Sequence, residues 1–148
     1  MHNILSSINF VTIAIGAAYL YLVNILMYFG LIGEKWSNAM DRDKGVKNWA
    51  HKTRPKDQRG WDQFFEFALY AIQTFFVMGM MNLAQVECYN HAFQLGLFSY
   101  IAYIIPEIYR AHAWEDRPCD LLAIKALRGF LGTAGLTVVL HHFGTDIY

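Results

Sequence analysis

The sequence predicts an all-α protein, an integral membrane four-helix bundle with both termini on the outer side of the membrane. The chain has 148 residues, of which 55% are hydrophobic and only 16% charged, whereas about a quarter of the residues of soluble domains are charged. Four apolar stretches are long enough to be membrane spans. The basic residues gather in two groups between these stretches. Residues 1–148 therefore form a single membrane domain.

The first two predicted spans are Ile8–Ile32 and Phe64–Val86. The first contains no charged residue and is long enough to cross the roughly 30 Å hydrocarbon core as a helix. Asp62 and Glu66 lie in or just before the first turn of the second span. Carboxylates at this position are favourable because the N-terminal end of a helix dipole is positive.

The last two predicted spans are Ala92–Ile108 and Leu121–Phe143. Pro106 is expected to bend or end the third span because proline lacks a backbone N–H. The fourth span carries Lys125 and Arg128 in its first turns. Their long side chains can extend to the level of the lipid headgroups.

The polar segment 34–60 separates the first two spans and holds eight of the twelve Lys and Arg residues. Pro55 and Gly60 argue against a continuous helix through this segment. A short helix from Trp36 to Trp49 is an alternative, but the apolar periodicity is weak and Gly45 interrupts it. We therefore expect an irregular, solvated inner loop.

The distribution of basic residues predicts the orientation in the membrane. With four spans, the 34–60 loop and the second basic group lie on the same side, which the positive-inside rule makes cytoplasmic. We expect a multi-pass protein of the cell inner (cytoplasmic) membrane, or of an organelle membrane in a eukaryote. Cys88 and Cys119 would face opposite sides and form no disulfide. Nucleic acid is not an expected partner, because the basic residues flank spans. The second basic group consists of Arg110, Arg117, Lys125 and Arg128.

Two sets of residues are expected to act at helix contacts. Glu66 is placed to pair with Arg128 or Lys125 at the inner interface, and the alternative is that both cations contact lipid phosphates. Small residues at regular spacing allow close approach of membrane helices. The last span accordingly has a predicted helix-packing face formed by Gly129, Gly132 and Gly135.

The predicted membrane interior holds amides and no charged side chain at mid-depth, which argues against a proton- or ion-coupled carrier. Amides in this setting more often join helices through hydrogen bonds. These intramembrane polar residues are Asn24, Gln73, Asn82 and Gln94.

Candidate chemical groups occur at both ends of the spans. On the outer side His91, His141 and His142 are of metal-ligand type, but adjacent histidines on a helix point about 100° apart, so we favour hydrogen bonding over a metal site. On the inner side His112 is a possible general base, although no catalytic motif accompanies it. We expect no catalytic residue and no cofactor.

Two short motifs resemble the small bacterial membrane proteins grouped as domain of unknown function 1761. The segment Asn24–Trp36 reads N-I-L-M-Y-F-G-L-I-G-E-K-W, and its Tyr28, Gly33 and Trp36 match the family pattern, whereas Asn24, Met27 and Gly30 replace its glycine, tryptophan and proline. Trp114–Pro118, W-E-D-R-P, is similar to the family's W-E-G-R-P. The resemblance implies four helices and about this length, and it implies no catalytic residues.

Three functions fit these features. The first is a non-enzymatic structural or accessory subunit that packs with itself or with other membrane proteins. The second is a carrier or pore for a small solute, which requires a polar cavity near the intramembrane amides. The third is a membrane enzyme acting on a lipid or thiol substrate through His112. Expected partners are membrane lipids including anionic headgroups, and a second copy or other membrane proteins.

Overall fold

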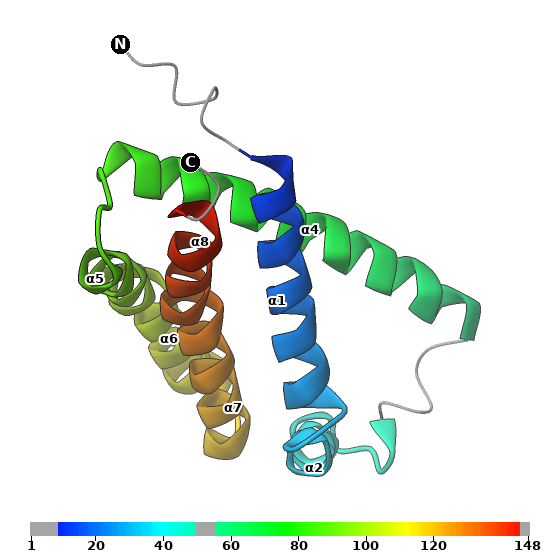
Figure 1. Cartoon of the computed structure of the whole chain (residues 1–148). Helices are drawn as coiled ribbons and strands as arrows, with labels where there is room; N and C mark the ends of the chain where they lie inside the picture. Colours follow the sequence, from blue (N-terminus) through cyan, green and yellow to red (C-terminus); the bar gives the residue numbers. More distant parts are fainter. Residues whose placement is uncertain (1–8, 50–55, 146–148) are drawn as a thin grey trace.

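The computed structural model describes residues 9–49 and 56–145, and every regular element in these ranges is helical (Figure 1). There are five helices, two of which contain a π-helical turn. The elements are α1 (Phe10–Tyr28), α2 (Gly33–Lys44), α4 (Lys56–Leu83), α5 (Tyr89–Ser99), η1 (Tyr100–Ile104), α6 (Ile105–Glu115), α7 (Cys119–Phe130), η2 (Leu131–Gly135) and α8 (Leu136–Thr145).

Helix α1 is shorter than the predicted first span. It begins after Asn9, whose side chain accepts a hydrogen bond from the backbone N–H of Val11 at 2.9 Å and caps the helix. It ends at Tyr28, and Gly30 N–H then bonds the carbonyl of Ile25 at 3.0 Å, so the chain turns before Ile32.

The prediction of an irregular loop at 34–60 is wrong at both of its ends. Residues Gly33–Lys44 form α2, because Gly45 does not interrupt this helix but ends it: its φ of 65° is the left-handed conformation that closes many helices. At the other end α4 already begins at Lys56 and continues through Gly60, since a glycine inside a helix costs only about 1 kcal/mol. Residues 50–55, with Pro55, lie outside the described residues.

Helix α4 differs most from the predicted bundle, because it crosses α1 obliquely instead of lying beside it (Figure 1). The crossing is close: a Cβ added at Gly16 of α1 would overlap the side chain of Thr74 of α4. The small residues Gly16 and Thr74 therefore allow α1 and α4 to approach closely where they cross. The N-terminal part of α4 extends past α1, and its Trp61, Phe64 and Phe65 are exposed.

The predicted third span does not end at Ile108, because the helix continues through Pro106 to Glu115. The π-helical turn η1 immediately precedes the proline, and its carbonyl of Tyr100 bonds the N–H of Ile105. A π turn changes the hydrogen-bonding register, so the missing N–H of Pro106, in the first positions of α6, is tolerated. The last helix, α7–η2–α8, begins at Cys119, slightly before the predicted Leu121, and ends at Thr145.

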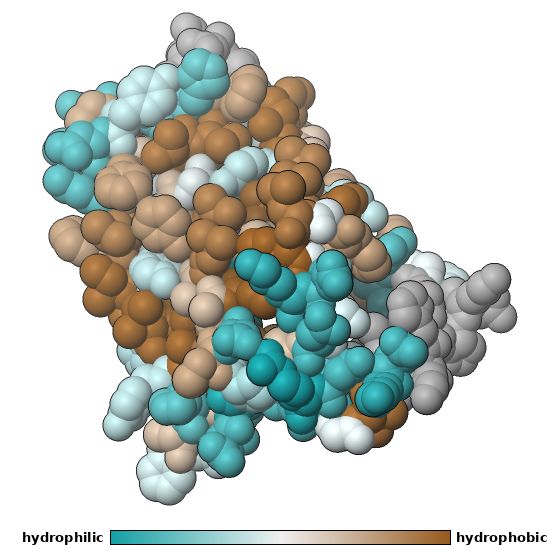
Figure 2. Space-filling view, turned by 90° about the horizontal axis from the view of Figure 1, so that it is seen from below, coloured by the Kyte–Doolittle hydropathy of each residue, from teal (hydrophilic) through white to brown (hydrophobic). Residues whose placement is uncertain are grey.

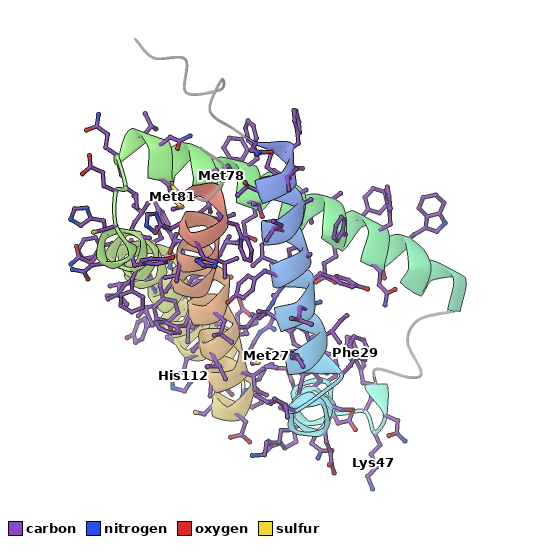
Figure 3. All side chains as sticks on the ribbon, in the orientation of Figure 1. Met27, Phe29, Lys47, Met78, Met81 and His112 are labelled. Carbon is purple, nitrogen blue, oxygen red and sulfur yellow. The ribbon has the colours of Figure 1, made fainter. Side chains whose placement is uncertain are left out.

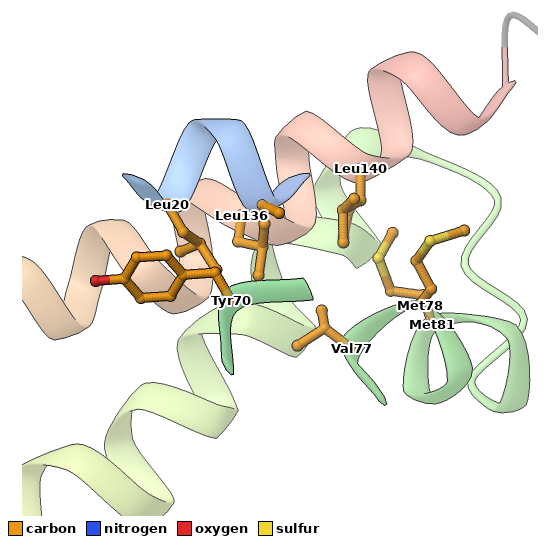
Figure 4. Close-up of a cluster of buried hydrophobic side chains, with 9 residues drawn as sticks. Leu20, Tyr70, Val77, Met78, Met81, Leu136 and Leu140 are labelled. Atoms are coloured by element: carbon orange, nitrogen blue, oxygen red, sulfur yellow. The ribbon is translucent and has the colours of Figure 1, made fainter. Parts of the chain in front are cut away.

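The main core lies where α1, α4 and α8 meet (Figure 4). Met78 and Met81 of α4 fill the space beside Leu140 of α8, and methionine suits such irregular gaps because its side chain is unbranched and flexible. The other labelled members of this cluster are Leu20, Tyr70, Val77 and Leu136. The core thus fixes α4 to the other helices through its C-terminal half.

Three of the helices are long and apolar enough to cross a membrane: Phe10–Tyr28, Gly60–Leu83 and Cys119–Gly144. The third of the four predicted spans falls in the helix Tyr89–Glu115, which is not among them. Viewed from the α2 end, hydrophilic side chains gather over α2, and hydrophobic side chains cover much of the remaining surface (Figure 2). The fold is all-α, with three candidate membrane spans and a polar surface at the α2 end.

Candidate functional site: a charged pocket between α1, α4, α6 and α7

Arg128 of α7 joins three helices near the polar end. Its Nη2 donates a hydrogen bond to the hydroxyl oxygen of Tyr70 on α4 at 3.0 Å and lies 3.7 Å from Oε1 of Glu66. The hydroxyl of Tyr70 donates to the same Glu66 oxygen at 2.6 Å. The guanidinium also lies over the ring of Tyr28 on α1, 5.4 Å from its centroid, an arrangement that favours a cation.

The structure therefore places Glu66 with Arg128, the first of the two partners considered for it from the sequence. The second, Lys125, forms no ion pair with any residue that the structure describes. Instead it lines a pocket together with Arg128, which follows it by about one turn on α7. Contact of Lys125 with lipid phosphate, the alternative raised from the sequence, stays a prediction.

This pocket, called the Arg128 pocket below, has a volume of about 270 Å³ and lies between α1, α4, α6 and α7. Its size is just below the roughly 300–1,000 Å³ of typical small-molecule sites. Its apolar walls consist of Leu20, Val23, Ile104, Ile108, Ala111, Gly129 and Gly132. Its polar lining consists of Tyr70, Gln73, Glu107, Lys125, Arg128 and Thr133. An apolar pocket with a few convergent polar groups is the usual form of a ligand site.

Of the four intramembrane amides predicted from the sequence, only Gln73 lines this pocket, and its Nε2 donates to the carbonyl of Gly132 at 3.5 Å. Asn24 is buried in α1, and its Oδ1 has no hydrogen-bond partner among the described residues. Asn82 and Gln94 are exposed. The four amides thus do not converge on one site.

The three glycines of the predicted packing face meet different neighbours. A Cβ at Gly129 would lie 2.6 Å from Ile104 of η1, one at Gly132 would lie 3.7 Å from Leu20, and one at Gly135 would overlap the hydroxyl of Tyr19. Residues three apart step by about 60° around an α-helix, so three such residues spread over two neighbours. A Cβ added at Gly96 of α5, a residue not predicted from the sequence, would lie 2.5 Å from Cα of Ala134, closer to another helix's backbone than an added Cβ at any other glycine that the structure describes.

The histidines considered as metal ligands interact with an aromatic ring instead. Tyr89 shares a hydrogen bond of 2.7 Å between its hydroxyl and Nδ1 of His142, and its ring meets that of His141 edge-on at 4.7 Å. His91 is exposed. Within the described parts of the chain, no three His, Cys, Asp or Glu side chains are grouped closely enough to hold a metal ion.

The possible general base considered from the sequence is His112. This histidine is exposed on α6 and does not line the Arg128 pocket (Figure 3). Met27, Met78 and Met81 lie inside the molecule, whereas Lys47 points away from it at the α2 end (Figure 3). Cys88 and Cys119 are both free and exposed. Cys88 directly precedes α5, and Cys119 is the first residue of α7.

Two polar residues that line the pocket were not predicted as site residues from the sequence. Tyr70 lies four residues after Glu66, and this spacing places both on one face of a helix, which is a signal that could have been used. Glu107 was not predicted as a site residue, and its place in the pocket depends on how α6 packs against α7.

Comparison with known proteins supports a membrane location. A family model described as "Protein of unknown function (DUF1761)" matches residues 11–141. A UPF0591 membrane protein of Schizosaccharomyces pombe is 24% identical over 132 residues, which cover 89% of this chain and 88% of the relative. No solved structure matches.

Proposed function

Because the chain belongs to the DUF1761 family of unknown function and is a small multi-pass membrane protein, we propose a function from its pocket: the protein binds a small solute between its helices without transforming it. The observation that carries this proposal is the Arg128 pocket, where cations, a carboxylate, an amide and hydroxyls converge on an otherwise apolar space. The carrier reading of the sequence required such a cavity near an intramembrane amide, and Gln73 lines it.

The proposal includes a fourth membrane crossing by Tyr89–Glu115. This helix is uninterrupted and longer than the about 20 residues that a span needs. Four crossings would put both termini on one side, which we propose to be the outer one. The end formed by α2 and the α6–α7 connection carries exposed basic residues and would face the cytoplasm, or the equivalent side of an organelle membrane.

A second candidate role is that of an accessory subunit, and the exposed aromatic arm of α4 favours it. Trp61, Phe64 and Phe65 are 60–66% exposed and contact one another at ring-centroid distances of 6.0–6.4 Å. Aromatic side chains are enriched where membrane helices meet the interface and where proteins meet partners. Under this reading the arm packs against a second copy or another membrane protein.

Filling the pocket should remove a bound solute. Gly132 lines the pocket and its added Cβ would meet only Leu20, at ordinary contact distance, so Gly132→Leu is expected to fold and to occupy the space. Native mass spectrometry after mild detergent extraction should show a non-protein mass on the wild type and none on this variant.

The matched control is Gly79→Leu, which places the same side chain on α4 where an added Cβ meets nothing within 4 Å. This variant should keep the bound mass. A wild-type protein that carries no small molecule would contradict solute binding, and a co-purifying protein in fixed ratio would favour the accessory role instead.

A further inference from the structure

The Arg128 pocket contains one cation and one carboxylate that pair with no side chain in the part of the chain that the structure describes. Arg128 is balanced by Glu66 through the ion pair and the shared Tyr70 hydroxyl. Lys125 on α7 and Glu107 on α6 both line the pocket, and no ion pair joins either of them to a described residue. A site whose unpaired groups are one positive and one negative charge is complementary to a ligand that carries both.

The cationic side of the pocket suits a phosphate. Lys125 and Arg128 are three residues apart on α7, a spacing that puts them on the same face of the helix. Arg128 uses Nη2 for Tyr70, and a guanidinium has five N–H donors in a planar fork that matches the oxygens of a phosphate. The Lys125 ammonium supplies a second donor and a further positive charge.

The wall of the pocket formed by α6 suits an ammonium group. Glu107 lies in the first turn of α6 and is exposed. Its carboxylate can only accept hydrogen bonds when ionised, so a primary ammonium with three donors is the complementary group. A quaternary ammonium would lack these donors.

The remaining walls and the size of the pocket indicate a lipid as the source of this headgroup. At about 270 Å³ the pocket holds a headgroup-sized fragment rather than a whole lipid. Ile104 of η1 and Ile108 of α6 line it, and Ile101 and Ile105 of the same continuous helix are exposed. The pocket wall and these exposed apolar side chains therefore belong to one helix, along whose outer surface acyl chains can lie.

We propose that the Arg128 pocket binds the zwitterionic headgroup of a membrane phospholipid that bears a phosphate and a primary ammonium, as in phosphatidylethanolamine. Lys125 and Arg128 bind the phosphate, and Glu107 binds the ammonium. This inference rests on the proposed function, because it names the ligand class of the same pocket.

The test compares lipids that share acyl chains and differ in headgroup: phosphatidylethanolamine, anionic phosphatidylglycerol and uncharged diacylglycerol, each titrated against the full chain in detergent and detected by native mass spectrometry. The wild type should bind phosphatidylethanolamine most tightly. Glu107→Gln should weaken the binding of phosphatidylethanolamine about tenfold and leave the binding of phosphatidylglycerol unchanged. Lys125→Gln should weaken the binding of both phospholipids about tenfold. The exposed residues Glu87 and Lys47 supply the matched controls Glu87→Gln and Lys47→Gln, which should change neither.

Two results would overturn the inference and leave solute binding intact. One is equal binding of all three lipids by the wild type while the pocket-filling Gly132→Leu variant still loses its bound mass. The other is displacement of the lipid by free phosphoethanolamine at equal concentration, which would show that the acyl chains contribute nothing. Binding of no probe together with an empty wild-type protein would overturn both proposals.

Discussion

Replacing Gly96 by alanine is expected to destabilise the protein by about 3 kcal/mol. The added Cβ would lie 2.5 Å from Cα of Ala134 and 2.5 Å from Oγ1 of Thr137. The first of these atoms belongs to the backbone of η2, so it can move only if α5 and the α7–η2–α8 helix separate. Thermal unfolding in detergent, followed by circular dichroism, should show a clear drop in Tm.

Gly79→Ala is the control for this prediction. An added Cβ at Gly79 meets nothing within 4 Å, and alanine is favoured over glycine in a helix by about 1 kcal/mol. We therefore expect an unchanged or slightly higher Tm. Equal Tm values for Gly96→Ala and Gly79→Ala would contradict the close packing of α5 against η2.

Replacing Arg128 by glutamine is expected to lower the stability by about 2–3 kcal/mol. The change removes the ion pair with Glu66, the hydrogen bond to Tyr70 and the contact with the ring of Tyr28. The side chains of Arg128 and Glu66 are 38% and 36% exposed, so the loss should be smaller than that caused by breaking a fully buried pair. Equilibrium unfolding of the variant in mixed detergent measures it.

A double-mutant cycle with Glu66→Gln isolates the pair itself. The double variant should lose less free energy of unfolding than the two single variants lose together, by a coupling energy of about 1 kcal/mol, because the two residues share one network. Arg42→Gln is the matched control: Arg42 pairs with Asp120 at side-chain exposures of 61% and 63%, and such surface pairs contribute at most about 1 kcal/mol. Additive effects of Glu66→Gln and Arg128→Gln would show that the two side chains act independently.

The sequence was sufficient to predict helices and to limit the side-chain partners considered for Glu66 to Arg128 and Lys125, for reasons that are local or topological. Long apolar stretches between basic segments specify membrane helices in any arrangement. Glu66, Lys125 and Arg128 all fall near ends of predicted spans that a four-span topology brings to the same side. Charge alone does not distinguish the two cations, and the choice of Arg128 depends on how α7 packs against α4.

The parts that could not be predicted depend on backbone conformation and on distant packing. Gly45 looked like an interruption because the sequence does not give its φ, and a left-handed glycine ends a helix without weakening it. Pro106 looked like a helix end because the π turn before it leaves no clear pattern. The crossing of α4 over α1 arises from a contact between Gly16 and Thr74, which no periodicity indicates.

The central claim is that Tyr89–Glu115 crosses the membrane, so that the basic end with the Arg128 pocket lies at the inner headgroup layer. Cys88 and Cys119 flank this helix, are both exposed and are the two cysteines of the chain. Each can therefore be probed alone in the variants Cys119→Ser and Cys88→Ser.

A membrane-impermeant maleimide applied to intact cells, or to sealed vesicles of known orientation, is the most direct measurement. It should label Cys88 without permeabilisation and Cys119 only after it. Labelling of both cysteines from the same side would contradict the fourth crossing and, with it, the position assigned to the pocket.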